Sequence, residues 1–549
     1  MTSIIPFLQL ADLCVQKGIK DIIICPGSRN AALTVAFTSN KSLNCKSISD
    51  ERSAGFIAVG QSISTNKPTV LICTSGTAAL NFHPAVAEAY FQNIPLLVIT
   101  ADRPPEWINQ HDGQTVFQEN CYGKHVKKFF HWLPDQSEAS ISYAERTSND
   151  AINLADSGPV HINIPIREPF YPENSNLEFS PWKNIQFAKI DHVIPKSEVD
   201  LFLQTVRNSK SKLLVVGQNL DKNLGEVAAI FASKYGFTLV GDSISNCEKG
   251  IKNQDVILKT IDSKSLESLK PDFLISIGSS LISKSLKLFL RNTKAENHWH
   301  IEDEEEIIDP FISITRKVVA NPQIILNQLI EIDCSHDANN QWDTFEKEAE
   351  RRIDNYFDQN SNYSEFQVVN ELIKSIPTGS VLHLGNSMSV RYVNSIQKNI
   401  PLNTEIHCNR GTSGIEGTLS TAVGHAMQTD KAIYCLLGDV SFQYDKNALW
   451  NNYMPSNLKI IILNNGGGII FQMIKGPKEQ DSFNEFFRTQ QNHKADLIAK
   501  EFGLTYISIN KNEDIQKGLS KLNKSTKPTI LEIFTDPEIN ELVYKTLFK

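Results

Sequence analysis

GDVSFQYDKNALWNNYMPSNLKIIILNNGGG, residues 438–468, is the stretch that decides the fold of this chain. It begins where one apolar run, AIYCLL, ends in Gly438-Asp439, and it closes where a second run, KIIIL, ends in Asn464-Asn465 and three glycines. Short apolar runs rich in Ile and Leu that end in Gly and Asn are typical of buried parallel strands. We therefore expect both polar ends to lie at the carboxyl edge of one sheet, where open α/β folds bind ligands.

The two strand ends offer oxygen atoms for a cation. Asp439 and Asn465 each provide a side-chain oxygen, and Gly467 frees a backbone carbonyl, which together suit Mg²⁺. Gly438 and Gly466 would let the backbone approach a diphosphate closely. Each end taken alone is most often an ordinary turn. The two together, each following a strand, favour a site for a metal ion and a diphosphate.

Length and composition limit the class of protein. A chain of 549 residues is too long for one core, so about three domains are expected. Its hydrophobic content of 41% and charged content of 21% are typical of a soluble globular protein. The net charge of −8 gives no reason to expect nucleic acid or an anionic membrane as partner. No apolar run approaches the roughly 18 residues of a membrane span, so membrane insertion is not expected. Nine cysteines without a CxxC pair and the lack of a signal-like N-terminus predict a cytoplasmic enzyme.

Strand-like and helix-like runs alternate along most of the chain. This rhythm predicts an α/β protein of three doubly wound domains with parallel sheets. We expect the domains to span residues 1–179, 197–333 and 365–549. A stretch with Pro172 reads as the first linker, and the polar stretch 334–364 with one helix reads as the second connector. The first and third domains share the same rhythm.

Several motifs together resemble a known family. The motif of Gly438-Asp439 followed by Asn464-Asn465 resembles the metal–diphosphate motif of thiamine-diphosphate-dependent enzymes. Three further motifs are similar to one branch of this family, the 2-succinyl-5-enolpyruvyl-6-hydroxy-3-cyclohexene-1-carboxylate synthases of menaquinone biosynthesis. They are PGSRN at residues 26–30, DERSA at residues 50–54 and the sequence NNGGGIIF. The resemblance covers most of the chain. It implies a pyrimidine-binding first domain, a central domain and a third domain that binds diphosphate and metal.

The resemblance implies thiamine diphosphate and Mg²⁺ or Mn²⁺ as cofactors. Glu51 would hydrogen-bond the aminopyrimidine ring and perform acid–base work there. From the residues alone, the acidic run at Glu51 more simply caps the next helix. In the family this glutamate meets the diphosphate site of a partner subunit, so a homodimer or homotetramer is implied. Further cofactor contacts are expected from Ser75, Ile470, Phe471 and Ile474, the last three as an apolar wall.

For the substrates, the resemblance implies 2-oxoglutarate and isochorismate. Arginine side chains bind carboxylates bidentately, so several are expected around such anions. Gln114 would hydrogen-bond the reacting intermediate. Ser387 and Arg391 are expected on one face of a helix that opens after Asn386. The full set of substrate-binding residues that the resemblance implies is Ser28, Arg29, Arg103, Lys284, Ser387, Arg391 and Arg410.

The resulting hypothesis is a decarboxylating carboligase, a transferase. It would add the succinyl carbanion equivalent of 2-oxoglutarate to isochorismate by conjugate addition and release CO₂. Two alternatives stay open. Another thiamine-diphosphate lyase, such as an acetolactate synthase or a 2-oxoacid decarboxylase, would share Glu51, Asp439 and Asn465 without needing the arginines. A non-catalytic cofactor-binding homologue is the other, and the retention of those three residues argues against it.

Overall fold

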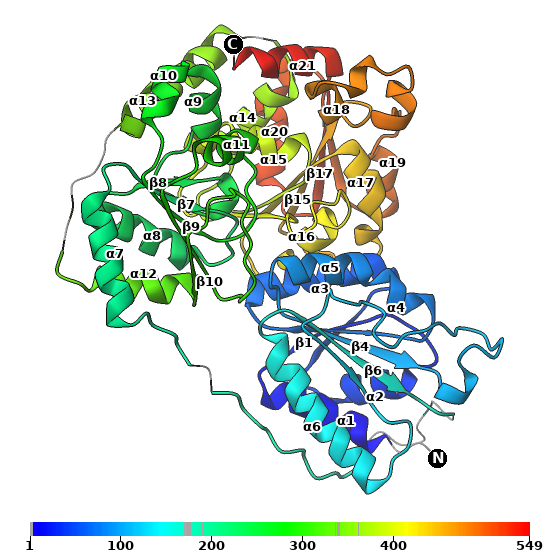
Figure 1. The fold of residues 1–549 in the computed structure, drawn as a ribbon. Helices are drawn as coiled ribbons and strands as arrows, with labels where there is room; N and C mark the ends of the chain where they lie inside the picture. The colour runs from blue at the N-terminus through cyan, green and yellow to red at the C-terminus, as the bar shows by residue number, and fades with distance from the viewer. Residues whose placement is uncertain are drawn as a thin grey trace.

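The computed structural model contains three parallel sheets, each with helices on both faces (Figure 1). This confirms the predicted fold class, while the predicted domain boundaries stay a prediction. Pro172 of the predicted first linker lies outside the described residues. No helix in the described part of the chain has the length and apolar character to cross a bilayer. The structure describes residues 4–168, 171, 177–188, 190–334, 336, 341–360 and 362–548.

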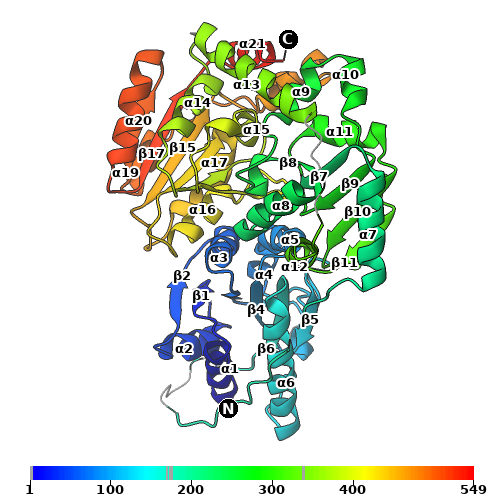
Figure 2. The same cartoon turned by 90° about the vertical axis from the view of Figure 1, so that its left-hand side faces the viewer.

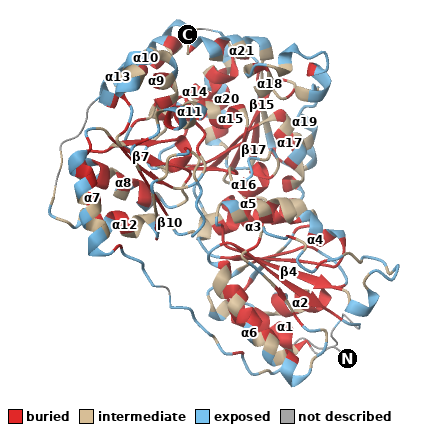
Figure 3. Cartoon of the chain, viewed as in Figure 1, coloured by how far each residue is buried: buried red, intermediate tan, exposed pale blue. Residues whose placement is uncertain are grey.

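The first sheet has six strands in the order β2-β1-β3-β4-β6-β5. Its inner strands β3 and β4 are apolar runs buried at every position, as expected of a parallel sheet covered on both faces (Figure 3). The strands are β1 (Asp21–Ile24), β2 (Asn44–Ser47), β3 (Thr69–Cys73), β4 (Leu96–Asp102), β5 (Lys128–His131) and β6 (Pro159–Pro165). The helices are α1 (Ile5–Gln16), α2 (Ala31–Ser39), α3 (Glu51–Thr65), α4 (Thr77–Asn81), α5 (His83–Phe91) and α6 (Glu138–Ala155).

The central sheet has five strands in the order β11-β10-β9-β7-β8. The strands are β7 (Lys212–Val216), β8 (Thr238–Gly241), β9 (Phe273–Ile277), β10 (Asn297–Glu302) and β11 (Arg316–Val319). The helices are α7 (Lys196–Asn208), α8 (Lys222–Tyr235), α9 (Gln254–Thr260), α10 (Ser263–Ser268), α11 (Lys284–Thr293) and α12 (Pro322–Ile330). The helix expected in the second connector is α13 (Gln341–Gln359), which packs into the core through Trp342 and Ile353.

The third sheet repeats the first. Its order is β13-β12-β14-β15-β17-β16, which is the order of the first sheet strand for strand. The strands are β12 (Val381–Leu384), β13 (Glu405–Cys408), β14 (Ile433–Gly438), β15 (Leu458–Asn464), β16 (Thr505–Ile509) and β17 (Thr529–Phe534). The helices are α14 (Glu365–Ser375), α15 (Met388–Asn394), α16 (Thr418–Ala426), α17 (Asp439–Asp445), α18 (Ile470–Met473), α19 (Asp496–Glu501), α20 (Ile515–Lys524) and α21 (Pro537–Thr546).

This strand order places a switch point in each of the two related sheets. The chain leaves β1 toward one side of the sheet and β3 toward the other, and β12 and β14 do the same. Ligands of open α/β sheets bind at the carboxyl ends of such strand pairs. The loops there touch: a Cβ on Gly27 would lie 2.3 Å from the Cβ of Thr74. The fold therefore provides one such pair of strand ends in the first domain and one in the third, which we call the first-domain and third-domain crevices.

The first and third domains meet where helix α3 crosses helix α16 (Figures 1 and 2). Two glycines allow the two backbones to touch. A Cβ on Gly60 would lie 2.0 Å from the carbonyl oxygen of Thr421, and a Cβ on Gly424 would lie 2.0 Å from that of Ile57. Real Cβ atoms do not come so close to backbone, so each glycine is required by the crossing and not by a turn.

Part of the first linker packs against the first domain. Trp182 is 5% exposed and its ring lies edge-on to that of Trp132, with 5.9 Å between the ring centroids. Asn149 of α6 donates from Nδ2 to the carbonyl of Lys183 at 2.9 Å. The stretch around Trp182 therefore packs on the first domain before the chain crosses to α7.

We predict that Gly60→Ala weakens the contact between the first and third domains. The new methyl group must push α16 away, and overpacking of this kind costs about 1–3 kcal/mol of unfolding free energy. Thermal unfolding followed by calorimetry measures the loss. Gly113→Ala is the matched control because a Cβ there would meet nothing within 4 Å. Equal unfolding temperatures for the two variants would contradict the tight crossing.

Candidate active site

The strand ends at Gly438 and Asn464 lie side by side. Strand β14 ends at Gly438, strand β15 ends at Asn464, and Gly438 is paired with Leu463 in the parallel register. Helix α17 starts at Asp439, so this carboxylate sits at the beginning of a helix at the carboxyl edge of the sheet. The predicted position of the metal–diphosphate loops is therefore confirmed as geometry. Their role in binding stays a proposal.

Asp439 is 3% exposed and its oxygens already accept hydrogen bonds. The backbone N–H of Val440 donates to Oδ1 at 2.8 Å, and the side-chain amide of Gln491 donates to Oδ2. Burial raises the pKa of Asp439 to about 6, and these hydrogen bonds lower it only in part. A buried carboxylate with a raised pKa gains free energy when a cation arrives to stabilise its charge.

Asn465 is held by a residue that the sequence did not reveal. Its Nδ2 donates to Oε1 of Glu365 at 2.7 Å, and the Tyr392 hydroxyl donates to the other carboxylate oxygen of Glu365 at 3.0 Å. This fixes the amide so that Oδ1 of Asn465 is the remaining atom. That oxygen is buried and has no hydrogen-bond partner among the described residues. A buried acceptor without a donor fits a missing cation.

Burial raises the pKa of Glu365 to about 7, with the nearby charge of Asp439 adding to the rise and the hydrogen bonds from Asn465 and Tyr392 opposing it. Two carboxylates of the same sign therefore share one buried region, which a divalent cation would neutralise. Oxygen-only donors at Asp439 and Asn465 suit Mg²⁺ or Mn²⁺. The residues present thus fit the metal that the resemblance implies.

The glycines that follow Asn465 adopt backbone shapes that other residues avoid. Gly466 has φ +74° and Gly467 has φ +149°. A Cβ on Gly467 would lie 2.5 Å from the carbonyl oxygen of Arg488. The backbone of Gly468 donates to the same carbonyl at 2.5 Å. The segment with Arg488 and Gln491 therefore covers the glycine loop directly, and both residues escaped the sequence analysis because no motif marks them.

The apolar wall expected from the sequence follows this loop. Ile470 begins helix α18 and packs on the main core, whereas Ile474 comes just after the helix and is 48% exposed. The ring of Phe471 lies beside that of Phe487, with 6.1 Å between centroids. Their position next to the glycine loop is compatible with the expected cofactor contact, and that contact stays a prediction.

Three basic side chains gather beside the third-domain crevice. Burial lowers the pKa of Arg391, and the nearby charge of Arg410 lowers it further. Burial likewise lowers the pKa of Lys287, with further contributions from Arg410 and Arg391. Arg410 contributes to both shifts, so the three cations lie close together and favour an anionic ligand. We call Lys287, Arg391 and Arg410 the basic cluster.

The basic cluster contains a lysine that the sequence analysis did not mark, and the role expected of Lys284 stays a prediction. Lys284 was the expected cation of the central domain, but it lies exposed in the first turn of α11, one turn before half-buried Lys287. Ser387 precedes α15 with φ +70°, and its carbonyl accepts a hydrogen bond from Nη1 of Arg391. Ser387 and Arg391 are therefore in contact, through the backbone of Ser387.

A residue of the first domain holds the loop that carries Arg410. Glu88 of α5 is fully buried and accepts hydrogen bonds from the backbone N–H groups of Gly411, at 2.8 Å, and Thr412, at 2.7 Å. Arg410 itself donates from Nη1 to the side-chain oxygen of Asn386 at 3.1 Å. The position of Arg410 thus depends on contacts from two domains.

The first-domain crevice holds the other candidate residues. Arg29 follows β1, is 4% exposed, and donates from Nη1 to the carbonyl of Ile166 at 2.9 Å. Burial lowers the pKa of Arg29 to about 10, and nearby Arg103 contributes. Ser28 lies beside it in the same loop, and Ser75 lies in the loop after β3 with a buried hydroxyl that lacks a partner among the described residues.

Arg103 and Gln114 belong to one exposed loop. Arg103 forms an ion pair with Asp112 at 2.5 Å and donates to the carbonyl of Gly113 at 2.6 Å. Gln114 has φ +55° and its Cα lies against Gly76, where a Cβ would be 3.2 Å away. The structure thus brings Gln114 to the loop of Ser75. The expected contact of Arg103 with a substrate carboxylate stays a prediction.

Glu51 is the first residue of α3, and Asp50 is the N-cap residue of this helix. The Asp50 carboxylate accepts from the backbone N–H of Ser53 at 3.2 Å, so Asp50 caps the helix. Glu51 is half-buried, and burial raises the pKa of its carboxyl group. The expectation that the acidic run at Glu51 caps the helix is therefore confirmed, with Asp50 as the capping residue. The catalytic role of Glu51 stays a prediction.

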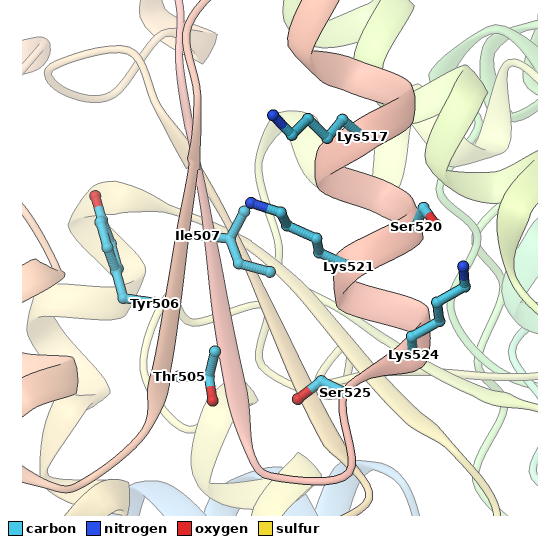
Figure 4. A pocket seen from close by; sticks show the side chains of 8 residues that line it. All are labelled: Thr505, Tyr506, Ile507, Lys517, Ser520, Lys521, Lys524 and Ser525. Carbon is cyan, nitrogen blue, oxygen red and sulfur yellow. The ribbon is translucent and has the colours of Figure 1, made fainter.

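A hollow elsewhere on the third domain does not belong to this site. A cavity of about 550 Å³ is lined by Thr505, Tyr506, Ile507, Lys517, Ser520, Lys521, Lys524 and Ser525 (Figure 4). Thr505 begins β16 and Ser525 precedes β17, so the hollow lies at the amino ends of the strands. Asp439 and Asn465 lie at the opposite edge.

Comparison with known protein families finds a match for each of the three domains. Residues 8–126 match the thiamine pyrophosphate enzyme N-terminal TPP binding domain, residues 178–384 match the middle domain of thiamine pyrophosphate enzymes, and residues 388–533 match the C-terminal TPP binding domain. The chain belongs to the thiamine pyrophosphate enzyme family. Both crevices of this thiamine pyrophosphate enzyme therefore fall within cofactor-binding domains.

Relatives of this thiamine pyrophosphate enzyme match it along nearly its whole length. A protein of Cytophaga hutchinsonii is 38% identical, with 98% of each chain covered. One of Flavobacterium psychrophilum is 36% identical, covering 99% of this chain and 98% of its own. One of Bacteroides fragilis is 33% identical, with 98% of each covered. All three are named 2-succinyl-5-enolpyruvyl-6-hydroxy-3-cyclohexene-1-carboxylate synthase.

We predict that Glu365→Leu loosens Asn465 and weakens metal binding. Loss of a residue that orients a ligand commonly costs about 10–100-fold in metal affinity. Titration of thiamine diphosphate binding with Mg²⁺ measures the change. Glu365→Gln keeps an acceptor for Asn465 and should recover most of the affinity, while Tyr392→Phe removes only the second contact and serves as control. Unchanged Mg²⁺ dependence in Glu365→Leu would contradict this role.

Proposed function

We propose that this chain catalyses the reaction of the relatives it resembles. It is a thiamine-diphosphate-dependent transferase that makes 2-succinyl-5-enolpyruvyl-6-hydroxy-3-cyclohexene-1-carboxylate from 2-oxoglutarate and isochorismate, with release of CO₂, in menaquinone biosynthesis. Membership of the thiamine pyrophosphate enzyme family and identities of 33% to 38% over almost the full chain support this assignment.

The basic cluster is the observation that supports these substrates best. Burial and neighbouring cations that include Arg410 lower the pKa of Arg391 and of Lys287, and an anionic ligand would stabilise both charges. Arginine presents a fork that matches a carboxylate. 2-Oxoglutarate is a dicarboxylate and isochorismate carries further carboxylates, so Arg391, Arg410 and Lys287 supply the charge that both substrates need.

Thiamine diphosphate, when bound, supplies the electron sink for decarboxylation. The chain's own residues do the rest. Asp439, Asn465 and the Gly467 carbonyl hold the metal, Gly438 and Gly466 let the backbone approach the diphosphate, and the raised pKa of Glu51 suits an acid–base group. Arg29 and Ser28 bind carboxylate at the first-domain crevice, and Gln114 orients the reacting group beside Ser75.

The decisive assay measures CO₂ released from 2-oxoglutarate with thiamine diphosphate and Mg²⁺, with and without isochorismate. We expect turnover to require both substrates, because the basic cluster is built for more carboxylates than one keto acid carries. Release without isochorismate would indicate a decarboxylase, and release from pyruvate would indicate another thiamine-diphosphate lyase. No release from either acid by the cofactor-loaded protein would indicate a non-catalytic homologue.

We propose further that two copies of the chain complete each site. The groups that shift the pKa of Arg29 come from the first domain, and those that shift the pKa of Arg391 come from the third and central domains. Each chain thus carries two separate charged half-sites. A second copy that pairs one first-domain crevice with the other chain's third-domain crevice would join them, which agrees with the role of Glu51 in the family.

Mixed dimers test this arrangement. Glu51→Gln should lower turnover by about 10²–10⁴-fold, as expected for loss of an acid–base group, while the variant still binds the cofactor. Asp439→Ala should lose the metal. If sites form between copies, co-expressing the two variants restores about a quarter of the parent activity, because half of random dimers contain one intact site of two. No recovery in isolated mixed dimers would place each site within one chain.

A cytoplasmic location is also proposed. All nine cysteines are free thiols in the structure, and burial raises the pKa of several of them, Cys14 to about 12 among them. Buried protonated thiols of this kind are typical of proteins that work in a reducing compartment.

A further inference from the structure

Three histidine rings form a buried triangle in the third domain, apart from the residues that bind the cofactor or substrates. His383 lies on β12 and His407 lies opposite it on β13 in the parallel register. His425 comes from the last turn of α16, above these strands. The ring centroids are 5.2, 5.1 and 5.1 Å apart, and the three residues are 2%, 5% and 3% exposed.

His407 is the unusual member of this triangle. Both of its ring nitrogens are buried and neither has a hydrogen-bond partner among the described residues. A neutral imidazole carries one N–H donor and one acceptor, and burying both without partners loses the free energy of hydration with no compensation. Native proteins seldom leave such a group unsatisfied, so a ligand is the natural partner for this ring.

A carboxylate completes the group. Glu405 lies two residues before His407 on the same face of β13, and its Oε2 is 3.8 Å from Nε2 of His407. The other oxygen, Oε1, pairs with Lys431 at 2.5 Å. The Glu405 side chain is 14% exposed, so this side of the cluster is the route to solvent. One ligand atom from each of Glu405, His407 and His425 lies within 4.8 Å of the others.

We propose that Glu405, His407 and His425 bind a divalent transition-metal ion of the Zn²⁺ class. Two imidazoles and one carboxylate form a set that such ions prefer, with a further position for water. The oxygen-only donors at Asp439 and Asn465 suit Mg²⁺ instead. The two sites therefore select different ions by the chemistry of their ligands.

His383 is not one of the three proposed ligands but orients one of them, His425. Its Nε2 lies 3.1 Å from Nδ1 of His425, a hydrogen bond that fixes the plane of the His425 ring. Ligating histidines in metal sites usually have such a partner on the second ring nitrogen, which sets the tautomer. The three donor atoms lie within 4.8 Å of one another, and a zinc ion would draw them closer to reach ligand distances of about 2.0–2.2 Å.

The bound ion would join the edge strand β13 to helix α16. Strand β13 leads directly into the loop of Arg410, and α16 is the helix that crosses α3 of the first domain. In addition, His425 lies at this crossing, since its backbone nitrogen would be 2.8 Å from a Cβ on Gly60. The site is thus structural: it ties one arm of the basic cluster to the contact between domains.

The test uses the full-length protein loaded with thiamine diphosphate and saturating Mg²⁺, so that the cofactor site is filled. After treatment with a chelator and return of Mg²⁺, Zn²⁺ is added and binding is followed by calorimetry, metal analysis and the unfolding temperature. We expect one tightly bound Zn²⁺ per chain and a higher unfolding temperature. No binding beyond the level of a control protein without the cluster would overturn the proposal.

Variants locate the ion. His407→Gln and Glu405→Gln should each lose more than about tenfold in Zn²⁺ affinity. Lys431→Gln should bind Zn²⁺ more tightly, because it removes a cation that pairs with Glu405. His125→Gln is the matched control, since His125 faces His83 at 3.0 Å in another part of the fold. Affinity lost in His125→Gln but kept in His407→Gln would refute the site.

A spectroscopic measurement covers the case in which a variant does not fold. Co²⁺ substituted into the parent protein should give visible absorption bands of the intensity that four-coordinate sites with nitrogen ligands produce. Weak bands of six-coordinate Co²⁺ alone would show binding by oxygen ligands only and would overturn the proposal.

Discussion

The contact of helices α3 and α16 is the constraint on which the rest of the molecule depends. Gly60 and Gly424 bring the two backbones together, and any side chain at either position would overlap a carbonyl oxygen. This crossing fixes the first sheet against the third. It also sets the first turn of α3, where Arg52 donates to the carbonyl of Tyr444 at 2.6 Å and Asp50 accepts from Asn447. Glu51 sits between these two anchors.

Buried charge explains how the site is arranged. At the third-domain crevice, Asp439 and Glu365 are buried with raised pKa values, while Arg391 and Lys287 nearby have lowered ones. Nearby Asp255 and Asp242 oppose the lowered pKa of Arg391 and of Lys287 only in part. These charges fit the proposed ligands, a divalent cation for the carboxylates and an anionic substrate for the basic cluster. Burial destabilises these charged side chains, and a bound ligand of opposite charge would offset that cost.

The repeated strand order shows why one chain carries two crevices. Loops that follow β1 and β3 in the first domain correspond to loops that follow β12 and β14 in the third. Arg29 and Ser75 occupy the first pair, and Ser387 and Asp439 occupy the second. The two domains share the switch point but differ in the residues at these loops.

Sequence by itself determined the parallel α/β class, the strand ends at Gly438 and Asn464, and the candidate residues that motifs mark, because strand periodicity and strand-end turns are local properties of the chain. The role expected of Lys284 stays a prediction, and the sequence did not mark Lys287, Glu365, Glu88 or the histidine triangle. Those residues act through partners that are distant in sequence, such as Asn465 for Glu365 and Gly411 for Glu88. Only the tertiary structure decided them, because burial and the pairing of polar atoms are set by how the elements pack.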